Sequence, residues 1–312
     1  MSESLRNPEQ ILRRLDWTVL RKLDGVLQGD YRTLFRGAGL DLADLREYQL
    51  TDDARHIDWN VTARMDTPYV REHNEDREIT AWFLLDLSPS VDFGSNAVKK
   101  RQVLIEFTAV LARLLTRSGN RVGAVFYGGG VDTVIPPRGG RRHVLHIMDS
   151  LLARPEMKTA RTTDLHEFLR AGFDLVRRRS LLFVISDFIS TPGWEEALSL
   201  LSRRHELLAV RLFDPLEMAL PDLGLIPLQD AETGEQIWVD THDKGFRKRF
   251  AAAAQQREHD LRDALQRAGV DALELSTDDD IADSILRFCQ LRKQRDRLAS
   301  GADARVHFGP SL

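Results

Sequence analysis

The 312-residue sequence is poor in cysteine and in long apolar runs. Its single cysteine, Cys289, excludes a framework of internal disulfides. No apolar run approaches the roughly 20 residues that a membrane-spanning helix requires. The stretch from Met1 to Arg14 is too polar for a secretory signal. We therefore expect a cytoplasmic protein with no membrane span.

The sequence also lacks the short motifs of several enzyme classes. It contains neither a G-x-x-x-x-G-K-[ST] nucleotide-binding loop nor a G-x-S-x-G nucleophile elbow. The net charge is −4, and arginines alternate with acidic residues, as in residues 257–262, which indicates solvated helix faces and not a nucleic-acid surface. These absences favour a globular binding protein that is not an enzyme and binds no nucleic acid.

What the sequence does contain, from about residue 78 onward, is an alternation of strand-like and helix-like segments. This order predicts an α/β fold with a mostly parallel sheet and helices on both faces. The predicted strands are residues 79–85, 122–127, 131–135, 181–185, 206–213 and 272–275. The predicted helices are residues 96–118, 141–152, 164–177, 194–203, 244–268 and 281–293. The short glycine linker 128–130 requires an antiparallel hairpin between the second and third strands.

The domain organisation follows from where this alternation is interrupted. Residues 1–77 are predicted to form an N-terminal module, and residues 78–297 the main α/β domain. A proline-containing segment, 214–240, with a turn signal at 232–235, predicts a β-hairpin inserted in that domain. Residues 298–312 are predicted to be a loose tail.

A set of polar residues falls where the predicted strands end. Asp86 ends the first strand and is followed by Ser88 and Ser90, while Asp187 follows the strand 181–185. Thr162 and Thr163 precede the helix that leads into that strand. Because ligands bind at the carboxyl ends of strands in parallel α/β sheets, we expect these side chains to converge.

The chemistry of this set indicates a hard cation. Carboxylate and hydroxyl oxygens suit Mg²⁺ or Mn²⁺, and the absence of histidine and cysteine from the set argues against zinc. Each piece alone has a simpler explanation, since serines and aspartates after strands commonly cap helices. The ordered combination is the more specific signal.

Asp86-x-Ser88-x-Ser90, Thr163 and Asp187 resemble the three ligand loops of von Willebrand factor A-type domains. The resemblance implies a Rossmann-like fold with a metal-ion-dependent adhesion site, in which these five residues hold Mg²⁺ directly or through water. Thr163 is chosen over Thr162 because it directly precedes Asp-Leu. Arg161 departs from the pattern, where many members have glycine.

The upstream sequence is similar to a narrower bacterial family, named domain of unknown function fifty-eight. The matching motifs are Leu45-Arg46-Glu47-Tyr48, Asp52-Asp53-x-Arg55-x-Ile57-Asp58-Trp59, Thr62-Ala63-Arg64 and Tyr69-Val70-Arg71-Glu72. The resemblance implies partnership with a MoxR-type AAA+ ATPase in chaperone-like maturation of other proteins. A partner's acidic side chain would then fill the open position on the metal.

Two other functions compete with this hypothesis. Asp86 at a strand end also suits a phosphoryl-transfer enzyme or phospho-acceptor, although Ser88 stands where haloacid-dehalogenase-type phosphatases have a second aspartate. Alternatively the metal site is vestigial and the N-terminal module binds the partner.

Several remaining polar residues are interpreted as structural. Arg46, Glu47, Asp58, Arg64 and a packed Trp59 are expected to fix the N-terminal module. The remaining predictions are surface or satisfied histidines at His143 and His146, a solvated basic patch at Arg138, Arg141 and Arg142, helix-capping acids at 278–280, and a buried thiol at Cys289.

Overall fold

The computed structural model divides the chain into two compact units, Met1–Gly29 with Ile79–Arg292, and Asp30–Glu78 with Lys293–Leu312. We refer to them as the sheet unit and the small unit. The structure describes residues 7–23, 45–49, 57, 59–65, 67–71, 79–95, 98–155, 163–229 and 235–306.

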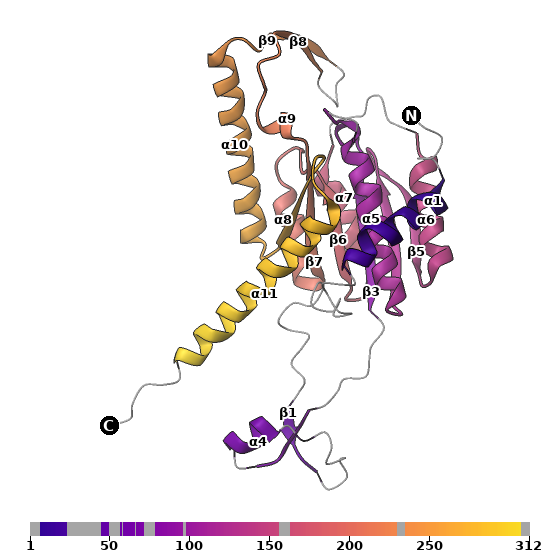
Figure 1. Ribbon diagram of the computed structural model, residues 1–312, viewed down its shortest axis with the longest axis vertical. Coiled ribbons are helices and arrows are strands. Elements are labelled where there is room, and N and C mark those ends of the chain that lie inside the picture. The colour runs from indigo at the N-terminus through magenta and orange to yellow at the C-terminus, as the bar shows by residue number, and fades with distance from the viewer. Residues whose placement is uncertain are drawn as a thin grey trace. The chain divides into compact units, whose positions relative to one another are not determined.

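A six-stranded sheet in the order β10-β7-β6-β3-β4-β5 forms the centre of the sheet unit (Figure 1). Its strands are β3 (Thr80–Asp86), β4 (Arg121–Tyr127), β5 (Val131–Arg138), β6 (Leu181–Ser186), β7 (Glu206–Phe213) and β10 (Asp271–Ser276). Neighbouring strands run parallel except β4 and β5, which form the predicted antiparallel hairpin. The prediction of a mixed α/β fold with a mostly parallel sheet is confirmed.

Helices cover the sheet because its central strands are apolar on both faces. The main helices are α5 (Lys100–Arg117), α6 (Arg141–Ala153), α7 (Leu165–Leu175), α8 (Trp194–Arg204), α10 (Lys244–Arg267) and α11 (Ile281–Val306). Trp82 and Leu84 of β3 pack in one apolar core with residues of α7, α8 and α10. Helix α5 contacts β3, β7 and β10. A central strand buried by helices leaves only its ends for polar function.

The first residues of the chain differ from the prediction. Helix α1 (Pro8–Leu15) and the π-helical turn η2 (Asp16–Leu20) bury Ile11, Leu12 and Leu15, and α1 contacts α5 and α6. The apolar side chains recur at helical spacing and therefore need a surface to cover them. The predicted boundary of a module spanning 1–77 was wrong, because residues up to Gly29 belong to the sheet unit.

The described part of the small unit contains a short antiparallel pair of strands, one short helix and the last residues of helix α11. Strand β1 (Leu45–Glu47) pairs with β2 (Tyr69–Arg71), and helix α4 (Trp59–Met65) lies between them in sequence. The backbone N–H of Tyr69 donates to Thr62 Oγ1 over 3.1 Å. Trp59 is 69% exposed, so the prediction that it packs was wrong. Asp58 and the side chains of Arg46 and Arg64 lie outside the described residues.

The inserted segment after β7 contains the predicted hairpin. Helix α9 (Pro215–Met218) leads to strand β8 (Leu225–Gln229), which pairs antiparallel with β9 (Gln236–Asp240). Because β7 runs parallel to β6, the segment leaves the sheet at the same edge as Asp187.

The end of the chain also differs from the prediction. Helix α11 was expected to end near Lys293 and to be followed by a loose tail from residue 298, but it continues to Val306. Its sequence has no proline and is rich in leucine, arginine and alanine, which favour helix. In the part of the chain that the structure describes, no helix is long and apolar enough to span a membrane.

Candidate functional site

The predicted site begins where β3 and β6 end side by side. The parallel register pairs Leu85 with Ile185, so Asp86 and Ser186 are the next residues on the two strands. The Ser186 hydroxyl donates to Asp86 Oδ2 over 2.7 Å. Both side chains are fully buried. The sheet itself therefore fixes the position of Asp86.

The loop after Asp86 brings two hydroxyls to the same place. The backbone N–H of Ser88 donates to Asp86 Oδ1 over 3.0 Å, and the hydroxyls of Ser88 and Ser90 lie 3.0 Å apart. Ser90 lies on a short 3-10 helix, Pro89–Asp92, which turns the chain back so that both serines are buried. Asp86, Ser88 and Ser90 thus form one buried group of oxygens, as predicted.

Asp187 is held by the loop that follows β6. The backbone N–H of Ile189 donates to Asp187 Oδ1 over 3.0 Å. Between them, Phe188 has a φ of 57°, which is uncommon for a bulky residue, and its ring packs 5.5 Å from that of Trp194. Aromatic packing therefore accompanies the turn that orients Asp187.

Thr163 lies beside this second loop. It is buried, and its carbonyl oxygen accepts a hydrogen bond of 2.8 Å from the Ser190 hydroxyl. The same hydroxyl accepts from the backbone N–H of Leu165 over 3.0 Å. Ser190, which the sequence analysis did not single out, therefore joins the threonine loop to the Asp187 loop. Thr162 and Arg161 lie outside the described residues.

The two aspartates influence each other electrostatically. Burial, together with the nearby negative charge of Asp187, raises the pKa of Asp86 to about 6. Hydrogen bonds from Ser186 and Ser88 act in the opposite direction. A pair of buried carboxylates requires positive charge nearby to be stable in ionised form.

Lys100 supplies such a charge, and sequence reasoning missed it. Its side chain is fully buried at the start of α5, and its Nζ donates to Asp187 Oδ2 over 2.8 Å and to Glu217 Oε1 over 2.6 Å. Burial alone would lower the pKa of Lys100, but the two carboxylates outweigh it and raise the pKa. The sequence did contain a signal for Lys100. Helix α5 begins shortly after the Asp86 loop, so its first residues lie at the same edge of the sheet as Asp86.

The donor set fits one small divalent cation. Asp86, Asp187, Ser88 and Ser90 offer only oxygen atoms, as Mg²⁺ prefers, and water would complete an octahedral shell. This set of ligands contains fewer carboxylates than many metal sites do. Among the residues that the structure describes, no group of three or more His, Cys, Asp or Glu side chains could hold a metal ion. Hydroxyls take the place of additional carboxylates.

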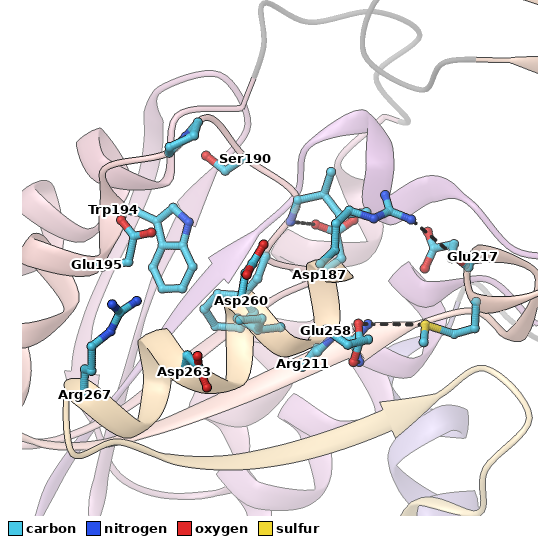
Figure 2. A pocket seen from close by; sticks show the side chains of 16 residues that line it. Asp187, Ser190, Trp194, Glu195, Arg211, Glu217, Glu258, Asp260, Asp263 and Arg267 are labelled. Carbon is cyan, nitrogen blue, oxygen red and sulfur yellow. Dashed lines mark hydrogen bonds and ion pairs between the residues drawn. The ribbon is translucent and has the colours of Figure 1, made fainter. Parts of the chain in front are cut away.

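A pocket of about 540 Å³ adjoins the site, with Asp187 and Glu217 among its lining residues (Figure 2). Trp194 and Glu195 of α8 line it together with residues of α10. Within it, Arg211 of β7 pairs with Glu258 of α10, with an Nη1–Oε2 distance of 2.7 Å. The pocket gives the Asp187 side of the site a concave surface.

The other polar candidates have structural roles. His143 Nε2 lies 2.8 Å from the carbonyl oxygen of Val122, and burial lowers the pKa of His143. Asp279 and Asp280 accept hydrogen bonds from the backbone N–H groups of Ser276 and Asp283. These contacts confirm a satisfied His143 and a helix-capping role for Asp280, whereas Asp279 accepts from the last residue of strand β10.

Two further predictions concern a basic patch and a thiol. The register of β4 and β5 pairs Arg138 with Val122, at the end of the sheet opposite to Asp86. Arg141 there pairs with Glu9, at 3.3 Å. Cys289 is buried in α11, as predicted. None of these residues belongs to the candidate site.

Comparison with known proteins gives relatives without an assigned activity. The uncharacterized protein Rv1480 of Mycobacterium tuberculosis is 37% identical over 283 residues, covering 91% of this chain and 89% of its own length. The uncharacterized protein MAV169 of Mycobacterium avium is 33% identical over 162 residues, covering 52% of this chain and 95% of its own.

Solved structures are more distant. The conserved hypothetical protein BatB from Bacteroides thetaiotaomicron has a TM-score of 0.41 and 12% identity, covering 69% of this chain and 99% of its own. An aerotolerance-related membrane protein from Bacteroides fragilis has a TM-score of 0.41 and 13% identity over the same shares. The family model "Protein of unknown function DUF58" matches residues 44–260, and the chain belongs to this family.

Proposed function

We propose that the chain is a magnesium-dependent protein-binding module of the von Willebrand factor A type and not an enzyme. The observation that carries the proposal is the buried convergence of the Asp86 carboxylate with the Ser88 and Ser90 hydroxyls at a strand end. Asp187 and Thr163 complete the proposed ligand set. Mn²⁺ would serve in place of Mg²⁺, since both accept oxygen ligands.

In this proposal the cation, the Asp86 carboxylate and the neighbouring pocket have separate roles in binding the partner. The bound cation supplies positive charge that attracts an acidic side chain of the partner. Asp86 is held by Ser186 and the Ser88 N–H, so its carboxylate is oriented toward the serine hydroxyls without rearrangement. The pocket next to Asp187 offers space for the partner residues that flank the acidic one.

We further propose a MoxR-type AAA+ ATPase as the partner, with chaperone-like maturation of a client protein as the process. Membership of the family supports this choice, because the upstream motifs at residues 45–72 imply that association. The client protein is an equally suitable source of the acidic ligand.

The test is a pull-down of the ATPase and of client proteins in Mg²⁺ or EDTA. Asp86→Ala is expected to weaken binding by at least about tenfold, and EDTA to do the same to wild type. Asp92→Asn is the matched control: Asp92 lies in the same loop but pairs with Arg101, at 3.3 Å. If neither Asp86→Ala nor EDTA weakened binding of the partner, a metal ion would not bridge the two proteins.

The phosphoryl-transfer alternative is less well supported. Ser88 stands where a phosphatase of the haloacid-dehalogenase type has its second aspartate, and the fully buried Asp86 lies beside serine hydroxyls instead. Labelling by acetyl phosphate that disappears in Asp86→Asn would favour the alternative.

A further inference from the structure

Lys100 is unusual because lysine is seldom fully buried. Its side chain has no exposed surface, and its ammonium lies between the carboxylates of Asp187 and Glu217 at 2.8 and 2.6 Å. Phe93 covers it from another side, with the ring centre 5.9 Å from Nζ. An ammonium in such a place is stable only while both partners stay close.

The charges of the cluster do not balance without a cation. Two carboxylates, those of Asp187 and Glu217, contact a single ammonium, and a third carboxylate, that of Asp86, interacts electrostatically with Asp187. Lys100 and a divalent ion would both interact with Asp187, one through Oδ2 and the other in the proposed site. The two positive charges are therefore in competition for the same carboxylate.

The cluster extends into the root of the inserted segment. Glu217 Oε2 accepts from the backbone N–H of Asp214 over 2.9 Å. Asp214 Oδ2 in turn accepts from the Ser95 N–H over 2.9 Å and from the Thr277 hydroxyl over 2.8 Å. Lys100 thus connects the Asp187 loop with the segment that starts at the end of β7.

We propose that Lys100 is a built-in counter-cation of the metal site, which keeps Asp187 and Glu217 in place without metal and weakens divalent-ion binding by sharing Asp187. The inference rests on the proposed function, since it concerns the same site. Because Lys100 supplies the counter-charge, the protein does not need the metal to fold. The site is therefore assembled before a cation and a partner bind.

The experiment compares wild type, Lys100→Met and the control Lys99→Met, which removes the same charge one residue away. Melting temperature is measured in EDTA and in millimolar Mn²⁺, and Mn²⁺ affinity by electron paramagnetic resonance of the free ion. Wild type and Lys99→Met should melt at nearly the same temperature as each other in EDTA, and Mn²⁺ should raise both melting temperatures by the same amount. Lys100→Met should melt about 10 °C lower in EDTA, bind Mn²⁺ about tenfold more tightly, and therefore gain a few degrees more than wild type on addition of Mn²⁺.

A Lys100→Met protein whose melting temperature and Mn²⁺ affinity match those of wild type would overturn the proposal. If Lys100→Met does not fold, Lys100→Met combined with Asp187→Asn removes both charges together. The proposal expects the double variant to fold in EDTA and to melt closer to wild type than the single variant. A double variant that is no more stable than the single one also overturns it.

Asp86→Ala separates this inference from the proposed function. Mn²⁺ binding that persists unchanged in Asp86→Ala contradicts the metal site. In that case the melting temperatures in EDTA of Lys100→Met and of Lys100→Met combined with Asp187→Asn still test the role of Lys100 as a counter-charge.

Discussion

Two buried ion clusters adjoin the same pocket and differ in what surrounds them. Arg211 and Glu258 join strand β7 to helix α10, and the more exposed Arg262 lies 4.0 Å from the same carboxylate. Lys100 instead faces two carboxylates at the sheet edge, next to serine hydroxyls. We call Arg211–Glu258 the balanced pair, since its carboxylate has a full cationic partner, whereas the edge cluster has more carboxylates than cations. Charge balance therefore distinguishes a pair that stabilises packing from a cluster suited to take up a cation.

Replacing Arg211 in the balanced pair should give the largest change in stability, and this change should not depend on a divalent cation. Arg211→Met leaves the buried Glu258 with only the exposed Arg262 nearby and should lower the free energy of unfolding by about 3 kcal/mol. The loss should be equal in EDTA and in Mg²⁺, as measured by urea unfolding followed by circular dichroism. A loss that Mg²⁺ restored would show that the two clusters are one, and the comparison would fail.

His205 is a buried imidazole, and its effect on stability should be intermediate and should depend on pH. Burial, together with the nearby Arg204 cation, lowers the pKa of His205 to about 4. The folded state therefore prefers neutral His205, and this contribution to stability is complete above the unfolded pKa of about 6.5. It is lost as the pH falls from about 6.5 toward 4, by about 3 kcal/mol in total.

His205→Gln should remove this part of the pH dependence. The measurement is the difference in unfolding free energy between wild type and His205→Gln at several pH values from 7 to 4, which cancels the titration of other groups. A difference that stays constant over this range would show that His205 is not kept neutral by the fold.

An exposed pair should have the smallest effect. Arg13 and Glu9 lie 3.6 Å apart on α1 with side chains 74% and 46% exposed. Arg13→Met is expected to change the free energy of unfolding by less than about 0.5 kcal/mol, because water screens the pair. A change as large as that of Arg211→Met would mean that burial is not what separates these ion pairs.

The sequence predicted those parts of the molecule that depend on local pattern. The apolar run of β3 and the glycine linker after β4 correctly predicted a buried strand before Asp86 and an antiparallel hairpin, because each signal is contained in a few neighbouring residues. Ser88 and Ser90 were found in the same way, since they lie on one short loop.

The parts that were missed depend on distant segments. In the sequence Lys100 is an ordinary lysine at a helix start, and its two partners, Asp187 and Glu217, lie 87 and 117 residues later. Ser190 reaches Thr163 across 27 residues in the same manner. Helix α1 was missed because its apolar face is covered by α5 and α6, whose surfaces the sequence does not display.

The two hydrogen bonds to Asp86 have a consequence for ion selectivity. Its rotamer is fixed by Ser186 and by the Ser88 N–H before any ion binds, so little conformational entropy remains to be lost. A rigid group with few oxygens suits Mg²⁺ and Mn²⁺ better than Ca²⁺, which needs six to eight adaptable ligands. The backbone turn at Leu87 and Ser88 would then act as a size filter, discriminating between ions of equal charge.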